Sequence, residues 1–233
     1  MEIPNTKNVT ILLYRCFSCG NFLSNILCYN KNFIPKIPGN LNLEDYFNMD
    51  LKHKIIMDTI PTISSELVNW RKYELGCMAF YNFYLGDLFE GRYHKFNYST
   101  IILATNASKN INPIVIELLK SNGHLFITAH EVDHMQAGKI IFPKSKVIQL
   151  VNDDLIRKLS INLKIAKPVP GNIINEEELP TVESAHQFDI GTLFNKEDFF
   201  NEVNKLLNSY DIEDKTLDPR VNEYYEKYVA LYV

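Results

Sequence analysis

The chain has 233 residues, of which 46% are hydrophobic, and this is enough for one domain over residues 1–233 with a single buried core. The net charge of −4 argues against nucleic acid as the main partner, because binding to a phosphate backbone usually requires a basic excess. The N-terminal residues do not resemble a secretory signal, and no apolar run is long enough to span a bilayer. We therefore expect a cytoplasmic protein without a membrane span.

The first predicted element is a buried strand over Val9–Tyr14, a short apolar run with β-branched residues. A loop with Gly20 follows, and Asn21 is the expected N-cap of a helix. The apolar residues of that helix recur at helical spacing, namely Phe22, Leu23, Ile26 and Leu27. A strand, a tight loop and a helix N-terminus in succession direct backbone N–H groups and the positive end of a helix dipole toward one place.

The middle of the chain is less regular. Residues 30–60 contain Pro35, Pro38 and Gly39, and we expect a substrate-facing loop there. Residues 64–93 are rich in aromatic side chains, for which a core-facing helix is favoured over an aromatic acceptor pocket. A strand over 99–104 and a short helix, with Asn112 as its N-cap and Gly123 just past its end, complete this part.

Further strands and helices alternate in the second half. Strands are predicted over 125–128 and 146–151, and the second is apolar on both faces, as in the middle of a parallel sheet. Asn152, Asp153 and Asp154 are expected to end it and to cap a helix. The apolar stripe of that helix comprises Leu155, Ile156, Leu159 and Leu163. Later helices are predicted around 199–207 and 221–233, so the pattern indicates an α/β three-layer sandwich with a central parallel sheet.

His130 belongs to two patterns that exclude each other. His130-Glu131-Val132-Asp133-His134 matches H-E-x-x-H, in which two imidazoles on one helix bind zinc and the Glu activates a water. A zinc-dependent hydrolase is therefore one alternative. Residues 125–128 suit a strand equally well, and then His130 lies at the carboxyl end of that strand without a metal.

Two segments resemble the PAPS-dependent sulfotransferases, P-loop-like α/β proteins whose donor is 3′-phosphoadenosine 5′-phosphosulfate (PAPS). Residues 10–23 resemble the first strand and the 5′-phosphosulfate loop of that family, with Gly20 on the family glycine. Residues 142–160 resemble the strand and helix that bind the 3′-phosphate, with Ser160 on the family serine. Thr128-Ala129-His130 lies where the family has Lys-Thr-His, which places His130 on the catalytic histidine.

The resemblance implies a nucleotide-binding, sulfotransferase-like fold and transfer of a sulfuryl group from PAPS to a hydroxyl or amine. His130 would remove the acceptor's proton while the sulfuryl group passes in line. The acceptor is expected to be a small molecule or a glycan, no metal is expected, and the oligomeric state is left open. The donor-binding residues that the resemblance implies are Arg15, Cys16, Phe17, Ser18, Cys19, Gly20, Asn21, Asn152 and Ser160.

The chain departs from the family at basic positions. Ser18, Thr128 and Asn152 stand where the family carries Lys or Arg, and losing these charge-assisted contacts should weaken donor binding by several kcal/mol. A catalytically degenerate nucleotide-binding protein is therefore a further alternative. Basic residues that could substitute are Arg15, Lys139, Lys144, Lys146 and Arg157.

The loop after the first strand also bears on two other motifs. A nucleotide-hydrolysing P-loop requires a Lys after its second glycine, and none follows Gly20. Cys16 and Cys19 form a C-x-x-C motif before a helix, as in thioredoxins. No proline takes a clear position facing that motif, and four cysteines in all are expected to be reduced thiols.

Overall fold

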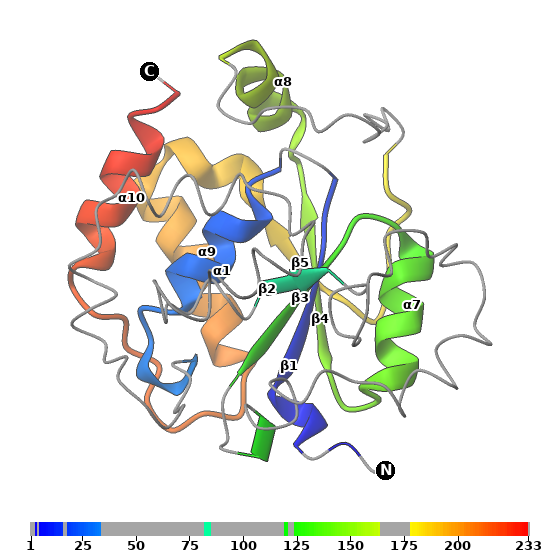
Figure 1. Ribbon diagram of the computed structural model, residues 1–233. Helices are drawn as coiled ribbons and strands as arrows, with labels where there is room; N and C mark the ends of the chain where they lie inside the picture. Colours follow the sequence, from blue (N-terminus) through cyan, green and yellow to red (C-terminus); the bar gives the residue numbers. More distant parts are fainter. Residues whose placement is uncertain are drawn as a thin grey trace, which may run out of the picture.

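The computed structural model describes residues 3, 5–15, 18–33, 82–84, 119–120, 124–163 and 178–232. The strands in this part of the chain form one five-stranded parallel sheet in the order β2-β3-β1-β4-β5 (Figure 1). Their bounds are β1 Val9–Leu13, β2 Asn82–Tyr84, β3 Leu125–Ala129, β4 Lys146–Val151 and β5 His186–Asp189. The predicted α/β architecture with a central parallel sheet is thus confirmed.

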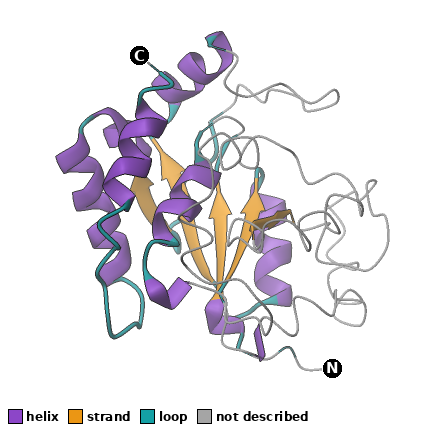
Figure 2. Cartoon of the chain, turned by 60° about the vertical axis from the view of Figure 1, so that its left-hand side comes forward, coloured by secondary structure: helices purple, strands orange, loops and turns teal. Residues whose placement is uncertain are grey.

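All strands of the described sheet run in the same direction (Figure 2), toward the end of the molecule where Figure 1 shows α8. β1 lies in the middle of this strand order, and every residue of Val9–Leu13 is buried, as expected for a strand covered on both faces. It pairs with β3 on one side and β4 on the other, so that Leu13 lies beside both Ala129 and Gln149. The carboxyl ends of these three strands therefore meet at one edge.

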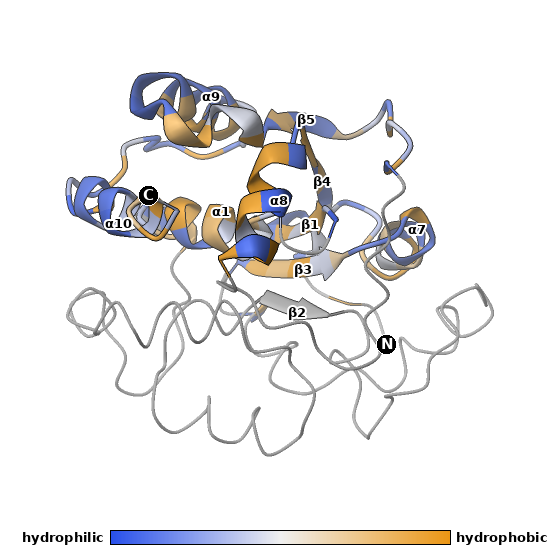
Figure 3. Ribbon diagram, turned by 90° about the horizontal axis from the view of Figure 1, so that it is seen from above, coloured by the Kyte–Doolittle hydropathy of each residue, from blue (hydrophilic) through white to orange (hydrophobic). Residues whose placement is uncertain are grey.

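Helices cover both faces of the sheet, which lies between them when viewed from above (Figure 3). On one face lie α1 (Gly20–Leu27), α9 (Lys196–Asn208) and α10 (Val221–Val229), and on the other α7 (Val132–Ile141). α8 (Asp154–Asn162) lies beyond the carboxyl end of β4, and single 3₁₀ turns occur at Thr6–Asn8, Lys31–Phe33 and Ile190–Phe194. None of the helices described is long and apolar enough to cross a bilayer.

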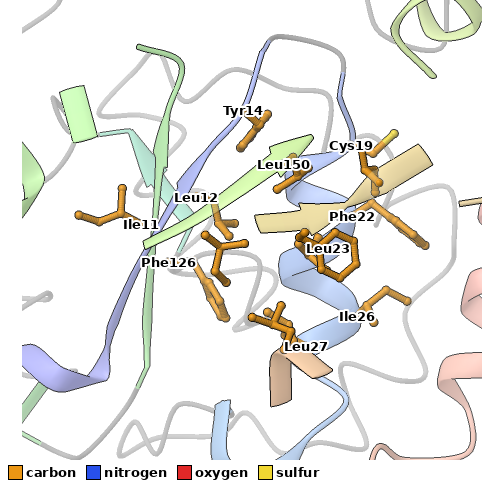
Figure 4. Close-up of a cluster of buried hydrophobic side chains, with 14 of the residues drawn as sticks. Ile11, Leu12, Tyr14, Cys19, Phe22, Leu23, Ile26, Leu27, Phe126 and Leu150 are labelled. Atoms are coloured by element: carbon orange, nitrogen blue, oxygen red, sulfur yellow. The ribbon is translucent and has the colours of Figure 1, made fainter. Parts of the chain in front are cut away.

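The core on the α1 side is aromatic. Phe22, on the inner face of α1, is fully buried (Figure 4). Its ring stacks on Tyr228 of α10 with 3.8 Å between ring centroids. Tyr224, one turn earlier on α10, packs against the same ring at 5.5 Å. Burial of one such side chain contributes about 2 kcal/mol, so these contacts fix α1 against the C-terminal helix.

The strands predicted around Val9, Leu125 and Lys146 are confirmed, as are the helices at 154–162, 196–208 and 221–229. The expected N-cap at Asn21 is wrong, because α1 begins at Gly20 and its N-cap residue is Cys19, two residues earlier than expected, with a left-handed conformation (φ 61°). The expected apolar stripe of α8 is only half right. Ile156 is buried, but Leu155 is 57% exposed.

Two strands were not expected. Asn82–Tyr84 forms β2, where a helix was predicted, because two aromatic residues suit a strand once β3 offers a pairing edge. β5 is short and mostly polar, so its sequence carries no clear strand pattern. The predicted strand at 99–104 and nearly all of the loop at 30–60 lie outside the described residues, as does the helix at 112–123 except for residues 119–120.

Candidate functional site

The candidate site lies at the carboxyl ends of β1, β3 and β4. The connection after β1 leads to one edge strand, β2, whereas the connection after the neighbouring β4 leads to the opposite edge strand, β5. Ligands of open parallel sheets bind where the strand order reverses in this way, outside the carboxyl ends. His130 and Asn152 directly follow β3 and β4, and Arg15 lies two residues after the end of β1; all three were predicted from sequence.

The loop between β1 and α1 (residues 14–19) brings polar side chains into the interior. Arg15 is 8% exposed and Ser18 is fully buried. The Ser18 N–H donates to the Arg15 carbonyl oxygen over 3.2 Å, which tightens the turn before Cys19 and the first residue of α1. Cys16 and Phe17, also expected to bind the donor, lie outside the described residues, as does the side chain of Asn21.

Gly20 is required by close packing. A Cβ atom at this position would lie 2.1–2.4 Å from ring atoms of Tyr14, closer than any side chain tolerates. The missing side chain lets the Tyr14 ring lie against the start of α1. The glycine that the sequence assigned to an anionic ligand thus has a packing role in this structure.

His130 follows the last residue of β3 and is held by Tyr14, which follows the last residue of the neighbouring strand β1. Its Nδ1 lies 2.8 Å from the Tyr14 carbonyl oxygen. A carbonyl oxygen only accepts a hydrogen bond, so the neutral imidazole carries its proton on Nδ1 and its lone pair on Nε2. The Tyr14 ring also packs edge-on against the imidazole, with 4.9 Å between centroids. The ring orientation and the tautomer of His130 are therefore both fixed.

Burial lowers the pKa of His130 to about 4, although the hydrogen bond to the Tyr14 carbonyl oxygen opposes this shift. The charge of the nearby His134 lowers the same pKa further. At neutral pH His130 is therefore uncharged, with a basic Nε2. A group in this state can accept a proton, but it is a weaker base than a solvent-exposed histidine.

Asp153 is a central residue of the site that the sequence presented only as a helix cap. Its side chain is 4% exposed and accepts hydrogen bonds from Arg15 Nε over 3.0 Å and 3.2 Å, one to each carboxylate oxygen. Arg15 Nη2 and the Ser18 hydroxyl donate to the same carboxylate. Asp154, whose side chain is 59% exposed, also accepts from Arg15.

These contacts raise the pKa of Arg15 above its ordinary value, chiefly through the hydrogen bond with Asp153. Arg15 in turn holds the pKa of Asp154 below its usual range. Arg15 is a cation in the loop where the resemblance expects a donor phosphosulfate, and it is paired with a carboxylate of the chain itself. An anionic ligand would have to displace that carboxylate.

Among the residues described, neither Asn152 nor Ser160 is hydrogen-bonded to Arg15. Asn152 is exposed and has a left-handed conformation (φ 58°), which turns the chain from β4 toward Asp153. Ser160 is buried in α8, where its hydroxyl lies 3.0 Å from the hydroxyl of Tyr232. The Tyr232 hydroxyl is also 3.0 Å from Cys19 Sγ, so the C-terminal residues join α8 to the start of α1.

The basic residues that could substitute for the missing family cations are divided between the amino and carboxyl ends of the strands. Lys139 Nζ donates to the Ser145 carbonyl oxygen over 2.7 Å, and Lys146 Nζ donates to the Ser209 carbonyl oxygen over 2.8 Å. Lys144 precedes β4, so all three lysines lie near the amino end of that strand. Arg15 and the buried Arg157 of α8 are the two candidate substitutes near the carboxyl ends of the strands.

The H-E-x-x-H residues are not on one helix. His130 follows β3, Glu131 is the extended N-cap residue of α7, and His134 lies within α7, with Nε2 3.7 Å from the Glu131 carboxylate. The zinc motif requires both imidazoles on adjacent turns of a helix, and the chain does not provide this arrangement. Among the residues described, no cluster of three or more His, Cys, Asp or Glu is placed to hold a metal ion.

Comparisons of the chain with models of protein families, with curated proteins and with solved structures find no match.

Proposed function

We propose that the protein is a sulfotransferase-like enzyme that binds a PAPS-type nucleotide at the carboxyl ends of β1 and β4 and uses His130 as general base. The observation that carries the proposal is the pairing of His130 with the β1–α1 loop. The imidazole is bound to the carbonyl oxygen of Tyr14, the residue directly before Arg15. A base and a cationic loop on adjacent parallel strands suit transfer of an anionic group to a hydroxyl or amine.

The chemistry requires a base only while the acceptor attacks. The acceptor oxygen or nitrogen forms a bond to sulfur, the bond from sulfur to the phosphate oxygen of the donor breaks, and 3′-phosphoadenosine 5′-phosphate (PAP) leaves. His130 Nε2 takes the acceptor's proton, since Nδ1 already carries one. The Tyr14 carbonyl oxygen would then stabilise the imidazolium that forms, because it accepts from Nδ1 in both protonation states.

The residues of the loop fit such a donor in part. Arg15 and Ser18 offer a guanidinium and a hydroxyl, both suited to a sulfate or phosphate oxygen. The Asp153 carboxylate holds these same donors, and Asn152 supplies no charge for a 3′-phosphate. Asp153 and Asn152 therefore favour a second candidate function, that of a nucleotide-binding protein that has lost transferase activity.

The first experiment measures the melting temperature with millimolar PAP and transfer from radiolabelled PAPS to a panel of phenol, sugar and amine acceptors. Ligand at one hundred times its Kd stabilises the folded state by about 2.7 kcal/mol, or roughly 5–10 °C for a chain of this size. His130→Ala should abolish transfer and keep the PAP-dependent shift. His134→Ala, four residues away on α7, is the control and should keep both.

The outcomes separate the candidates. A PAP-dependent shift without transfer to any acceptor supports the nucleotide-binding protein. Full transfer by His130→Ala would end its assignment as the base. No shift with PAP in the wild type would contradict both candidates.

A further inference from the structure

The Asp153 carboxylate lies against the donors that an anion would use. Arg15 presents Nε and Nη2 to it, and Ser18 presents its hydroxyl. A guanidinium edge together with a hydroxyl is also the donor set with which proteins bind sulfate and phosphate. All three residues are at least nine-tenths buried, so the carboxylate replaces water as the partner of these donors.

The position of Asp153 in the chain offers its side chain a second partner. Asp153 is the N-cap residue of α8, and Asp at this position usually accepts from the free backbone N–H groups of the first turn. In this structure its side chain makes no such capping bond and reaches the β1–α1 loop instead. Asn152, directly before it, has a left-handed backbone conformation (φ 58°). Moving the carboxylate from Arg15 to the start of α8 would exchange one set of hydrogen bonds for another.

We infer that Asp153 is an internal competitor for a tetrahedral oxyanion, so that Arg15 and Ser18 bind sulfate or phosphate only after its carboxylate moves to cap α8. This inference rests on the proposed role of the β1–α1 loop in binding an anionic group. The Asp153 carboxylate occupies the donors of Arg15 and Ser18, and it carries a charge of the same sign as the ligand. The anion binds Arg15 in place of the carboxylate, and the released carboxylate accepts hydrogen bonds from the backbone N–H groups of the first turn of α8.

The test compares Asp153→Asn with the wild type, using inorganic sulfate and phosphate as probes in calorimetry at constant ionic strength. Removing a like charge that contacts the ligand's donors should tighten anion binding about tenfold or more. Asp154→Asn is the matched control. It removes the neighbouring carboxylate on the same arginine, but that carboxylate is largely exposed and should change the affinity much less.

The double variant Arg15→Gln with Asp153→Asn shows whether the gained affinity belongs to this loop. The inference requires that this variant lose the gain. The inference is overturned if Asp153→Asn binds each anion no more tightly than the wild type does. It is also overturned if the gain in anion affinity persists in the double variant, which lacks Arg15. PAP is measured in parallel, because stronger binding of PAP than of free phosphate identifies the ligand as nucleotide-borne, whereas equal binding identifies it as a free oxyanion.

Asp153→Ser provides a second neutral variant if Asp153→Asn does not fold. Variants that fold only when sulfate is present support the inference, because the anion then replaces the missing carboxylate. Two variants that stay unfolded even with sulfate would show that Asp153 is a structural group, and the inference would fail. No step requires transfer of a sulfuryl group. A gain of sulfate binding by Asp153→Asn therefore stands even if the wild type binds no PAP and transfers nothing.

Discussion

The imidazole of His130 and the carbonyl oxygen of Tyr14 are joined by a 2.8 Å hydrogen bond between the ends of β3 and β1. Because the contact is made by the Tyr14 backbone, the tautomer of His130 depends on strand pairing. Each residue of β1 from Val9 to Leu13 has a partner in β3, and the hydrogen bond from the Tyr14 N–H to the Ala129 carbonyl oxygen continues that pairing. The candidate base is therefore positioned by the rigid part of the sheet.

The first prediction concerns the protonation of His130. Its pKa is lowered to about 4, so a nuclear magnetic resonance titration should show the Nδ1–H neutral ring from pH 8 down to about pH 5. Tyr14→Phe keeps the backbone contact and the aromatic ring, and should leave the titration unchanged. Tyr14→Ala removes the ring that packs against the imidazole, so water should reach His130 and its pKa should rise toward 6.5. A midpoint near 6.5 in the wild type would contradict this account of burial.

The second prediction concerns the buried ion pair of the loop. Arg15→Gln leaves the Asp153 carboxylate buried without its cation and should lower the free energy of unfolding by about 3–5 kcal/mol. Urea denaturation measures this change. Lys196→Gln is the control, because it breaks the exposed pair with Glu226 and should cost less than about 1 kcal/mol. Equal losses in the two variants would show that burial does not govern the contribution of Arg15.

Much of the sheet could be predicted because its central strands carry their own signal. β1 and β4 are apolar runs with turn residues after them, and Gly20 marks the turn before α1. β2 and β5 lack such a signal, since three or four residues become a strand only when a neighbour supplies hydrogen bonds. Local pattern therefore predicts the centre of this sheet and not its edges.

For the candidate site, the sequence predicted which residues lie at the strand ends but not which side chains they contact. Arg15, His130 and Asn152 follow strands, and strand ends of a parallel sheet meet at one edge. The partner of Arg15 is Asp153, 138 residues further along the chain, and nothing local distinguishes this Asp from an ordinary helix cap. The role of Gly20 was hidden for the same reason, because it depends on where the Tyr14 ring packs.

The third prediction concerns that packing. Gly20→Ala should destabilise the protein by roughly 1–3 kcal/mol, because the added methyl group overlaps the Tyr14 ring. In a Tyr14→Ala background the same change should be neutral or stabilising, since Ala favours a helix more than Gly does. Gly138→Ala on α7 is the comparison. Its Cβ atom would lie 2.8 Å from the end of the Ile11 side chain, which can rotate away, so the cost should be smaller. Denaturant midpoints of the wild type, Gly20→Ala, Tyr14→Ala and the double variant measure the coupling between residues 14 and 20.

The last prediction concerns acid stability and a second buried histidine, which directly precedes β3 and so lies at the amino ends of the strands. His124 is 6% exposed, its Nε2 lies 2.8 Å from the Thr10 hydroxyl, and burial lowers its pKa to about 3. The unfolded chain binds a proton near pH 6.5, whereas the folded chain does so only near pH 3, so stability is full above pH 6.5 and falls as the pH drops toward 3. Each pH unit in that window should cost about 1.4 kcal/mol from this residue alone.

His124→Gln keeps a polar partner for Thr10 and removes the titrating group, so its unfolding free energy should depend less on pH between 6.5 and 4 than that of the wild type. His134→Gln is the matched comparison on α7. Its histidine also has a lowered pKa, but it is less buried and has Glu131 and Asp133 as acidic neighbours that oppose the shift. The slope should therefore change less in His134→Gln than in His124→Gln. Parallel pH profiles for the wild type and His124→Gln would mean that His124 is accessible to water in the folded protein.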